Sequence, residues 1–303
     1  MSSVIEDLKQ WGPDDSYERM SSLQAQTYTW NLATSHYENF PVISWAVPKR
    51  LRQHFANVYA FCRWADDLGD EIESTKESLW LLEWWQVELG KCYRNESQHP
   101  VYVALHETIQ KFSIPVEHFS ALISAFVQDQ TVTEYETYDQ LLNYCTRSAN
   151  PVGRIILCLC AQSSDENVAH SDSICTGLQL TNFWQDVSRD YQIGRIYLPR
   201  EDRLRFGVTD QQMQSQRISP EFRDLLEFEV ERARMLLVSG KPLVAAMPGR
   251  MKIDIDLFIR GGLLVLDGIQ RINFDVWDQR PVVRKPQLFV AAVKSLGNLL
   301  SFR

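Results

Sequence analysis

Apolar residues recur at three- and four-residue steps along most of the chain. Between residues 49 and 71, for example, Leu51, Phe55, Val58, Cys62 and Ala65 follow this spacing. It places them on one face of an α-helix, which then has a polar opposite face. The same pattern predicts further helices over residues 21–35, 77–93, 139–162, 171–191, 219–239, 252–274 and 286–301.

Prolines indicate where several of these helices begin or end. Pro48, Pro100 and Pro115 each suit the first turn of a helix, where the missing N–H is not needed. Pro41 ends the helix that precedes it, because the residue before a proline avoids the α conformation. The β-branched and aromatic stretch 131–138 is either a very short extended segment or a loop.

The whole pattern favours an all-α protein. With 13 glycines and 12 prolines in 303 residues, the chain contains few helix breakers, and it shows neither a sheet pattern nor a repeat. The polar residues 1–18 predict a flexible N-terminal arm. We expect about ten helices to form a single bundle domain over residues 19–303.

The composition and net charge of the chain argue against several classes of function. A formal net charge of −8 argues against nucleic acid as a partner. The chain lacks an apolar run of about 18 residues and a signal-peptide start, so we expect a cytoplasmic protein with its six cysteines reduced and buried. An acidic protein that binds an anionic ligand needs counter-charge, which favours bound metal cations.

Two groups of acidic residues stand at helical spacing. Asp66 and Asp70 lie one turn apart, and Asn182, Asp186 and Asp190 form a second stripe of oxygen ligands. Either group alone is more often a solvated helix surface. If the two helices face each other, however, they offer hard oxygen ligands from both sides of a cavity, which suits Mg²⁺ bound to a diphosphate.

The chemistry that this arrangement suggests is loss of a diphosphate from an isoprenoid. Mg²⁺ neutralises the charge on the leaving group, and an aromatic pocket shields the carbocation. For each candidate lining residue, ordinary core packing is the alternative. These candidates are Phe40, Trp45, Phe55, Tyr59, Phe126, Phe183 and Trp184.

Both aspartate motifs resemble those of the squalene/phytoene synthase family. Residues 59–70, YAFCRWADDLGD, are similar to the first motif of that family. Residues 178–190, LQLTNFWQDVSRD, with GRIYLP at 194–199, are similar to the second. The resemblance implies an isoprenoid-synthase-like helix bundle with a central active-site cavity. Residues 37–42 and 144–153 and the insert FWQ at 183–185 further resemble the bacterial hydroxysqualene synthases of hopanoid biosynthesis.

The resemblance also implies roles for individual residues. Two or three Mg²⁺ ions would be held, directly or through water, by Asp66, Asp70, Asn182, Asp186 and Asp190. The residues expected to contact the diphosphate and its isoprenoid chain are His36, Phe40, Tyr59, Arg63, Gln179, Asn182, Phe183 and Arg195. Tyr197 would donate a hydrogen bond near the leaving group. For His36, capping of a helix end is the alternative.

One departure from the family bears on the reaction. Many members carry a tyrosine with an acid/base role where this chain has Thr146 or Arg147. Its loss puts the first condensation step in doubt, and Arg147 either contacts diphosphate, positions a water or has only a structural role. The resemblance then implies conversion of presqualene diphosphate and water to hydroxysqualene, without NADPH.

Other functions remain open at this stage. The chain could instead be a head-to-head condensing synthase that uses farnesyl or geranylgeranyl diphosphate, or a non-catalytic protein that binds isoprenoid diphosphates. The amphipathic residues 286–301 suggest transient contact with the inner membrane surface, although a terminal helix packed on the core is the alternative. Association with other enzymes of the same pathway is a further expectation.

Overall fold

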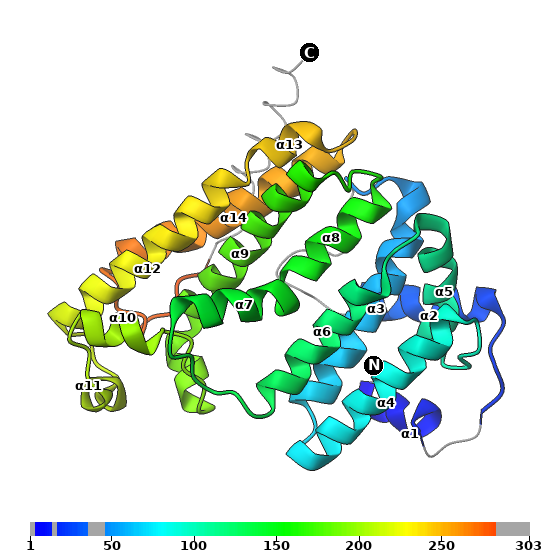
Figure 1. Ribbon diagram of the computed structural model, residues 1–303, viewed down its shortest axis with the longest axis horizontal. Helices are drawn as coiled ribbons and strands as arrows, with labels where there is room; N and C mark the ends of the chain where they lie inside the picture. Colours follow the sequence, from blue (N-terminus) through cyan, green and yellow to red (C-terminus); the bar gives the residue numbers. More distant parts are fainter. Residues whose placement is uncertain (1–3, 14–16, 36–45, 283–303) are drawn as a thin grey trace. The chain divides into compact units, whose positions relative to one another are not determined.

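The computed structural model describes residues 4–13, 17–35 and 46–282 (Figure 1). In these residues the regular secondary structure is α-helical, and the one β-type contact is an isolated bridge between Glu134 and Ile196. The prediction of an all-α protein is therefore confirmed. Within the same ranges, each helix is either too short or too polar to cross a bilayer. The predicted helix over residues 286–301 lies outside the described residues.

The chain divides into two compact units, Met1–Thr131 with Ile155–Ala161 and Val132–Arg154 with Gln162–Arg303. We call them unit 1 and unit 2. Unit 1 contains α1 (Val4–Trp11), α2 (Ser22–Ser35), α3 (Lys49–Asp70), α4 (Thr75–Tyr93), α5 (Pro100–Phe112) and α6 (Val116–Asp129). The predicted boundary between an arm at 1–18 and a single domain at 19–303 stays a prediction.

Helix α3 is the central element of unit 1, since it contacts α1, α2, α4, α5 and α6. Its apolar face contributes Phe61 and Trp64, both fully buried. Trp64 stacks on Trp85 of α4 with ring centroids 5.3 Å apart, and Phe61 meets Phe119 of α6 edge to face at 4.9 Å. This aromatic core fixes the orientation of α3 and hence of its polar face.

Within residues 1–18, for which the sequence predicts an arm, Val4–Trp11 form the helix α1. The hydroxyl of Tyr28 donates to Asp7 Oδ2 at 2.6 Å, and Trp11 packs edge to face on the same tyrosine at 4.8 Å. Trp64 Nε1 also donates to the Tyr28 hydroxyl, at 2.9 Å. These contacts come from distant residues, so the local polarity of residues 1–18 did not reveal them.

Unit 2 is built around a long helix, α9 (Asp165–Gln192). The helices α12 (Pro220–Ser239) and α14 (Met251–Arg271) run alongside it, as Figure 1 shows. Gly177 makes the α9–α12 contact possible, because a Cβ there would lie 2.9 Å from Leu237 Cγ. Unit 2 also holds the shorter helices α7 (Tyr138–Ser148), α10 (Arg200–Arg205), α11 (Asp210–Ser215) and α13 (Pro242–Ala246).

Two predicted helix boundaries were wrong. The helix expected over 139–162 is broken at Ala149 into α7 and α8 (Asn150–Leu159). Pro151 explains the break, since it has no N–H for the helical ladder and restricts the residue before it. Helix α9 begins at Asp165 and not near residue 171, because the Ser164 side chain accepts a hydrogen bond from the Asn167 amide and caps the helix.

Residues 131–138 form neither a regular strand nor an isolated loop. The Ile196 amide donates to the Thr133 carbonyl at 2.7 Å, and the Arg200 and Glu201 amides donate to the Tyr135 and Glu136 carbonyls, both at 2.9 Å. These bonds join the segment 133–136 to the segment that follows α9.

Helix α10 is anchored to α12 by a buried charge cluster. Arg232 Nη1 of α12 contacts Asp202 Oδ2 at 2.6 Å and Glu229 Oε1 at 3.3 Å. The Arg232 guanidinium also lies 4.1 Å from the ring centroids of both Tyr138 and Phe228. Glu229 is fully buried, and burial raises its pKa to about 8, with Arg232 lowering it and Asp202 raising it further. A neutral Glu229 leaves the cluster with one carboxylate for one guanidinium.

The substitution Glu229→Gln should flatten the pH dependence of stability. The folded protein keeps the Glu229 proton up to about pH 8, whereas an ordinary glutamate loses it near 4.5. The free energy of unfolding therefore falls as pH rises through this window. Gln has nearly the same shape and does not titrate. The free energy of unfolding of the variant, measured with urea, should therefore rise relative to that of the wild type between pH 5 and 8.5. A difference that stays constant over this range would contradict the assignment.

Candidate active site

The first aspartate group lies on the last turns of α3. Asp66 is half exposed, Asp70 is exposed, and Asp67 between them is buried. Arg63 Nη2 pairs with Asp67 Oδ1 at 2.6 Å, while Arg63 Nη1 lies 3.6 Å from Asp66 Oδ2. Arg63 therefore compensates the charge of the buried Asp67. Asp66 and Asp70 lie at the accessible end of the helix.

Unit 1 supports this end of α3 from α6. The side-chain amide of Gln130 donates to the Gly69 carbonyl at 2.8 Å. A Cβ at Gly69 would lie 3.4 Å from the Phe126 ring, so the two helices approach closely here. Phe126 and Tyr59, two of the predicted lining residues, are both partly buried, whereas Phe55 is buried.

The second aspartate group lies near the C-terminal end of α9 and is partly buried. Arg280 binds Asp186 through both carboxylate oxygens, with Nε 2.5 Å from Oδ1 and Nη2 2.9 Å from Oδ2. Arg189 Nε lies 3.8 Å from the same Oδ1. The Gln185 side chain donates to the Pro281 carbonyl and so also holds the segment next to Arg280. Asp186 is thus charge-compensated within unit 2.

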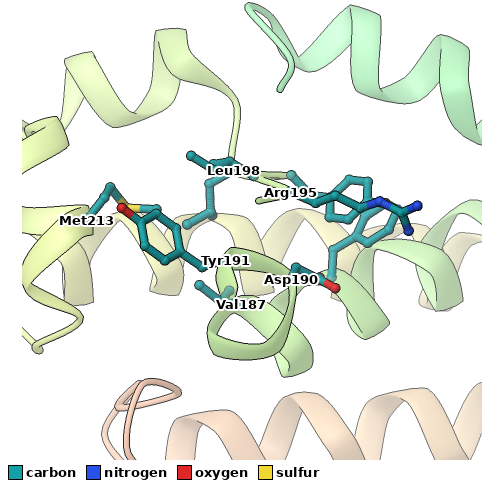
Figure 2. A pocket seen from close by; sticks show the side chains of 9 residues that line it. Val187, Asp190, Tyr191, Arg195, Leu198 and Met213 are labelled. Atoms are coloured by element: carbon teal, nitrogen blue, oxygen red, sulfur yellow. The ribbon is translucent and has the colours of Figure 1, made fainter. Parts of the chain in front are cut away.

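Asp190, one turn further, lines a small pocket that is partly open to solvent. Figure 2 shows the Asp190 and Arg195 side chains toward one end of this pocket and Tyr191 and Met213 toward the other. Burial raises the pKa of Asp190 to about 7, and the Asp186 carboxylate raises it further, against the lowering effect of Arg195 and Arg189. The pocket therefore combines one carboxyl group and one guanidinium with aromatic and aliphatic side chains.

Aromatic rings form one wall of the pocket. Phe183 and Tyr197 stack with centroids 3.7 Å apart and planes at 9°. Tyr197 in turn lies 6.0 Å from Tyr135 and 6.3 Å from Tyr144, both buried. The structure thus brings together Phe183, Asp190, Arg195 and Tyr197, which the sequence had placed in one site. Trp184, in contrast, is fully buried on α9.

The remaining predicted residues are placed as follows. Asn182 is exposed and Gln179 partly buried, both on α9. Arg147 donates from Nη2 to Asn143 Oδ1 of its own helix at 3.2 Å. His36, Phe40 and Trp45 lie outside the described residues. The cysteines for which the pKa is raised by burial, to about 12 at Cys62, Cys92 and Cys145, are poor nucleophiles, as expected of packed thiols.

The donor atoms fit a hard divalent cation. In the described residues of either unit, no three acidic, His or Cys side chains converge on one cation position. Mg²⁺ nevertheless binds proteins through one or two carboxylates and takes water and phosphate oxygens for the rest. Burial, and then the neighbouring Asp186 carboxylate, raise the pKa of Asp190, and a cation bound here would favour its charged form.

Sequence reasoning missed Arg280 and part of the pocket. Arg280 is separated from Asp186 by most of unit 2, and nothing in the local pattern of residues 275–282 indicates an ionic contact. The unpredicted lining residues are Val187, Tyr191, Ile196, Leu198 and Met213. Met213 had no local signal, whereas Val187 and Tyr191 lie close to Asp190 on α9 and Ile196 and Leu198 lie in the motif at 194–199.

Comparison with known proteins gives a consistent classification. Residues 33–287 match the family described as Squalene/phytoene synthase. Hydroxysqualene synthase from Rhodopseudomonas palustris is 36% identical over 214 residues, which cover 70% of this chain and 72% of that protein. Phytoene synthase from Arthrospira platensis is 27% identical over 282 residues, 89% of this chain and 88% of that one.

A solved structure agrees with these matches. The crystal structure of squalene synthase HpnC from Alicyclobacillus acidocaldarius has a TM-score of 0.80 and 38% identity, covering 84% of this chain and 95% of that one. The chain belongs to the squalene/phytoene synthase family, as its aspartate motifs suggested. Members of this family are enzymes that act on isoprenoid diphosphates, typically with a divalent metal.

The Asp186–Arg280 contact should be measurable in the metal-free protein. Asp186→Asn and Arg280→Gln, alone and combined, should give a coupling free energy of about 1 kcal/mol in urea unfolding, because the pair is bidentate and partly buried. The exposed pair Arg94–Glu96 serves as the control, and its coupling free energy should be only about a few tenths of a kcal/mol. Equal coupling in the two cycles would show that Arg280 does not compensate Asp186.

Proposed function

We propose that the protein is a hydroxysqualene synthase that converts presqualene diphosphate and water to hydroxysqualene and diphosphate. The observation that carries the proposal is the pocket at the end of α9, where Asp190 and Arg195 meet the stacked rings of Phe183 and Tyr197. A diphosphate needs cationic partners and a carbocation needs an aromatic, poorly hydrated surface. This pocket supplies both kinds of group.

Identity to hydroxysqualene synthases supports the choice within the family. The Rhodopseudomonas palustris enzyme is 36% identical, and those of Sinorhizobium fredii and Zymomonas mobilis are 31% and 33% identical. The resemblance also implies that Thr146 and Arg147 stand where many family members carry a tyrosine. This departure favours an enzyme that begins from a cyclopropylcarbinyl diphosphate and does not form it.

Each residue has a defined task in this proposal. Asp66, Asp70, Asp186 and Asp190, with Asn182, would hold Mg²⁺, which when bound supplies positive charge to the diphosphate. Arg195 and Arg63 bind diphosphate oxygens, and the Tyr197 hydroxyl donates to the leaving oxygen. Arg280, already paired with Asp186, holds that carboxylate in its orientation.

The reaction then proceeds by loss of diphosphate and capture by water. The C–O bond breaks with its electron pair on the diphosphate, and the cyclopropylcarbinyl cation rearranges. Phe183 and the ring of Tyr197 exclude bulk water from the cation. The oxygen of one water molecule forms the new C–O bond and releases a proton, so no reductant is consumed and NADPH is not required.

A second candidate is a condensing synthase that joins two allylic diphosphates. The match to Arthrospira platensis phytoene synthase favours it, since that alignment covers 89% of this chain. Its metal-binding residues would be the same. Incubation with farnesyl or geranylgeranyl diphosphate as the sole substrate separates the two, because our proposal expects little turnover.

Incubation with presqualene diphosphate and Mg²⁺ should give an alcohol, identified by mass spectrometry, whether or not NADPH is present. Asp66→Asn and Asp186→Asn should each slow diphosphate release by about a hundredfold or more, since each removes charge from the leaving-group site. Glu71→Gln, which removes an exposed carboxylate next to Asp70, should stay within about twofold of the wild type.

Three results would contradict the proposal in different ways. Squalene formed with NADPH would indicate a reductive synthase. Rapid use of farnesyl diphosphate alone would indicate the condensing reaction. Equal diphosphate release by the wild type and both aspartate variants would leave only the non-catalytic binding protein.

Location and further partners follow from the proposed substrate. We propose that the enzyme works in the cytoplasm and exchanges its very apolar substrate and product at the membrane surface or with other enzymes of the same pathway. Removal of residues 286–303 should then weaken flotation with liposomes. Unchanged flotation would exclude this segment from membrane contact.

A further inference from the structure

Arg203 on α10 is a buried cation that the proposed reaction does not use. Its side chain is only 2% exposed, although both of its acidic partners are accessible. Arg203 pairs with Glu134, which is 40% exposed, and its Nη1 lies 3.2 Å from Asp210 Oδ1, which is 91% exposed. A buried guanidinium is costly without a carboxylate, so Arg203 holds its partners against α10.

Helix α10 is itself fixed in place. The residue before Arg203, Asp202, is buried and binds Arg232 of α12 at 2.6 Å. Arg203 also takes part in the backbone structure, because its amide donates to the Pro199 carbonyl at 3.0 Å and its carbonyl accepts from the Val208 amide at 2.8 Å. Arg203 is thus a firm attachment point for Glu134.

Glu134 lies in the segment that supports the pocket. This segment, residues 133–136, accepts hydrogen bonds from the Ile196, Arg200 and Glu201 amides. Ile196 stands between Arg195 and Tyr197, both of which line the pocket with Asp190. Tyr135, next to Glu134, is buried and lies against Tyr197. The ion pair is therefore connected to the pocket wall through one short backbone contact.

We propose that Arg203 and Glu134 are positioning residues of the reaction. Their ion pair holds residues 133–136 against residues 195–201 and thereby sets the place of Arg195 and Tyr197 beside Asp190. The inference rests on the proposed function for the roles of Arg195 and Tyr197. Asp210, the other partner of Arg203, lies outside the 133–136 segment and does not share this role.

Glu134→Gln is the main test, because it keeps the size of the side chain and removes its charge. The value of kcat/KM for presqualene diphosphate should fall about tenfold, mainly through kcat, since misplaced groups lose transition-state contacts. Asp210→Asn removes a charge from the same arginine and should leave kcat/KM within about twofold. Arg203→Lys keeps the positive charge and should retain more activity than Arg203→Gln.

Hydrogen exchange gives a readout that needs no substrate. Exchange at the Ile196 amide, which is bonded to the Thr133 carbonyl, should speed up in Glu134→Gln and stay unchanged in Asp210→Asn. If the wild type does not turn over presqualene diphosphate, the proposed function fails, and the exchange comparison alone decides the inference.

Two results would overturn the inference. One is exchange at Ile196 that is the same in the wild type and in Glu134→Gln. The other is a Glu134→Gln variant with normal kcat and KM in an active enzyme, even if its Tm is lower, because that pattern describes a purely structural ion pair.

Discussion

The partly buried charges of Asp186 and Asp190 are the constraint around which unit 2 is arranged. Carboxylates one helical turn apart repel each other, and burial among apolar side chains strengthens the repulsion. The structure compensates them with basic groups from separate parts of the unit. Arg280 takes both oxygens of Asp186, while Arg189 and Arg195 lower the pKa of Asp190. The charge that remains on this helix end suits a divalent cation with a diphosphate.

The helices behind α9 keep these charges in place. Gly177 lets α12 approach closely, and the buried cluster of Asp202, Glu229 and Arg232 attaches α10 to α12. The segment that bears Arg195 and Tyr197 runs between α9 and α10, so its position depends on both attachments. Apolar packing and buried ion pairs thus cooperate to present a few polar groups at one pocket.

Much of this could be predicted from the sequence, because helical periodicity and the two aspartate motifs are local signals. Residues 49–70 and 220–239 were placed within a residue or two for that reason. The break at Ala149 was missed although Pro151 is visible in the sequence, since the apolar pattern continues across it. Helix α1 and the Asp186–Arg280 pair depend on contacts between distant residues, which no local pattern encodes.

In the candidate site, too, local patterns revealed some residues and missed others that depend on distant contacts. Asp190, Arg195 and Tyr197 lie within one stretch of the sequence and line one pocket, and their roles in binding and catalysis stay predictions. Glu134 and Arg203 had no signal of their own, because a single glutamate in the stretch 131–138 and an arginine among other arginines look like solvated surface. Only the burial of the guanidinium distinguishes this pair.

The origin of the product oxygen tests the central claim most directly. When presqualene diphosphate is incubated with the enzyme and Mg²⁺ in water enriched in ¹⁸O, the account predicts an alcohol that carries one ¹⁸O atom, formed in equal amount with the released diphosphate. A hydrocarbon product, or an alcohol without the label, would contradict capture of the cation by water in this site.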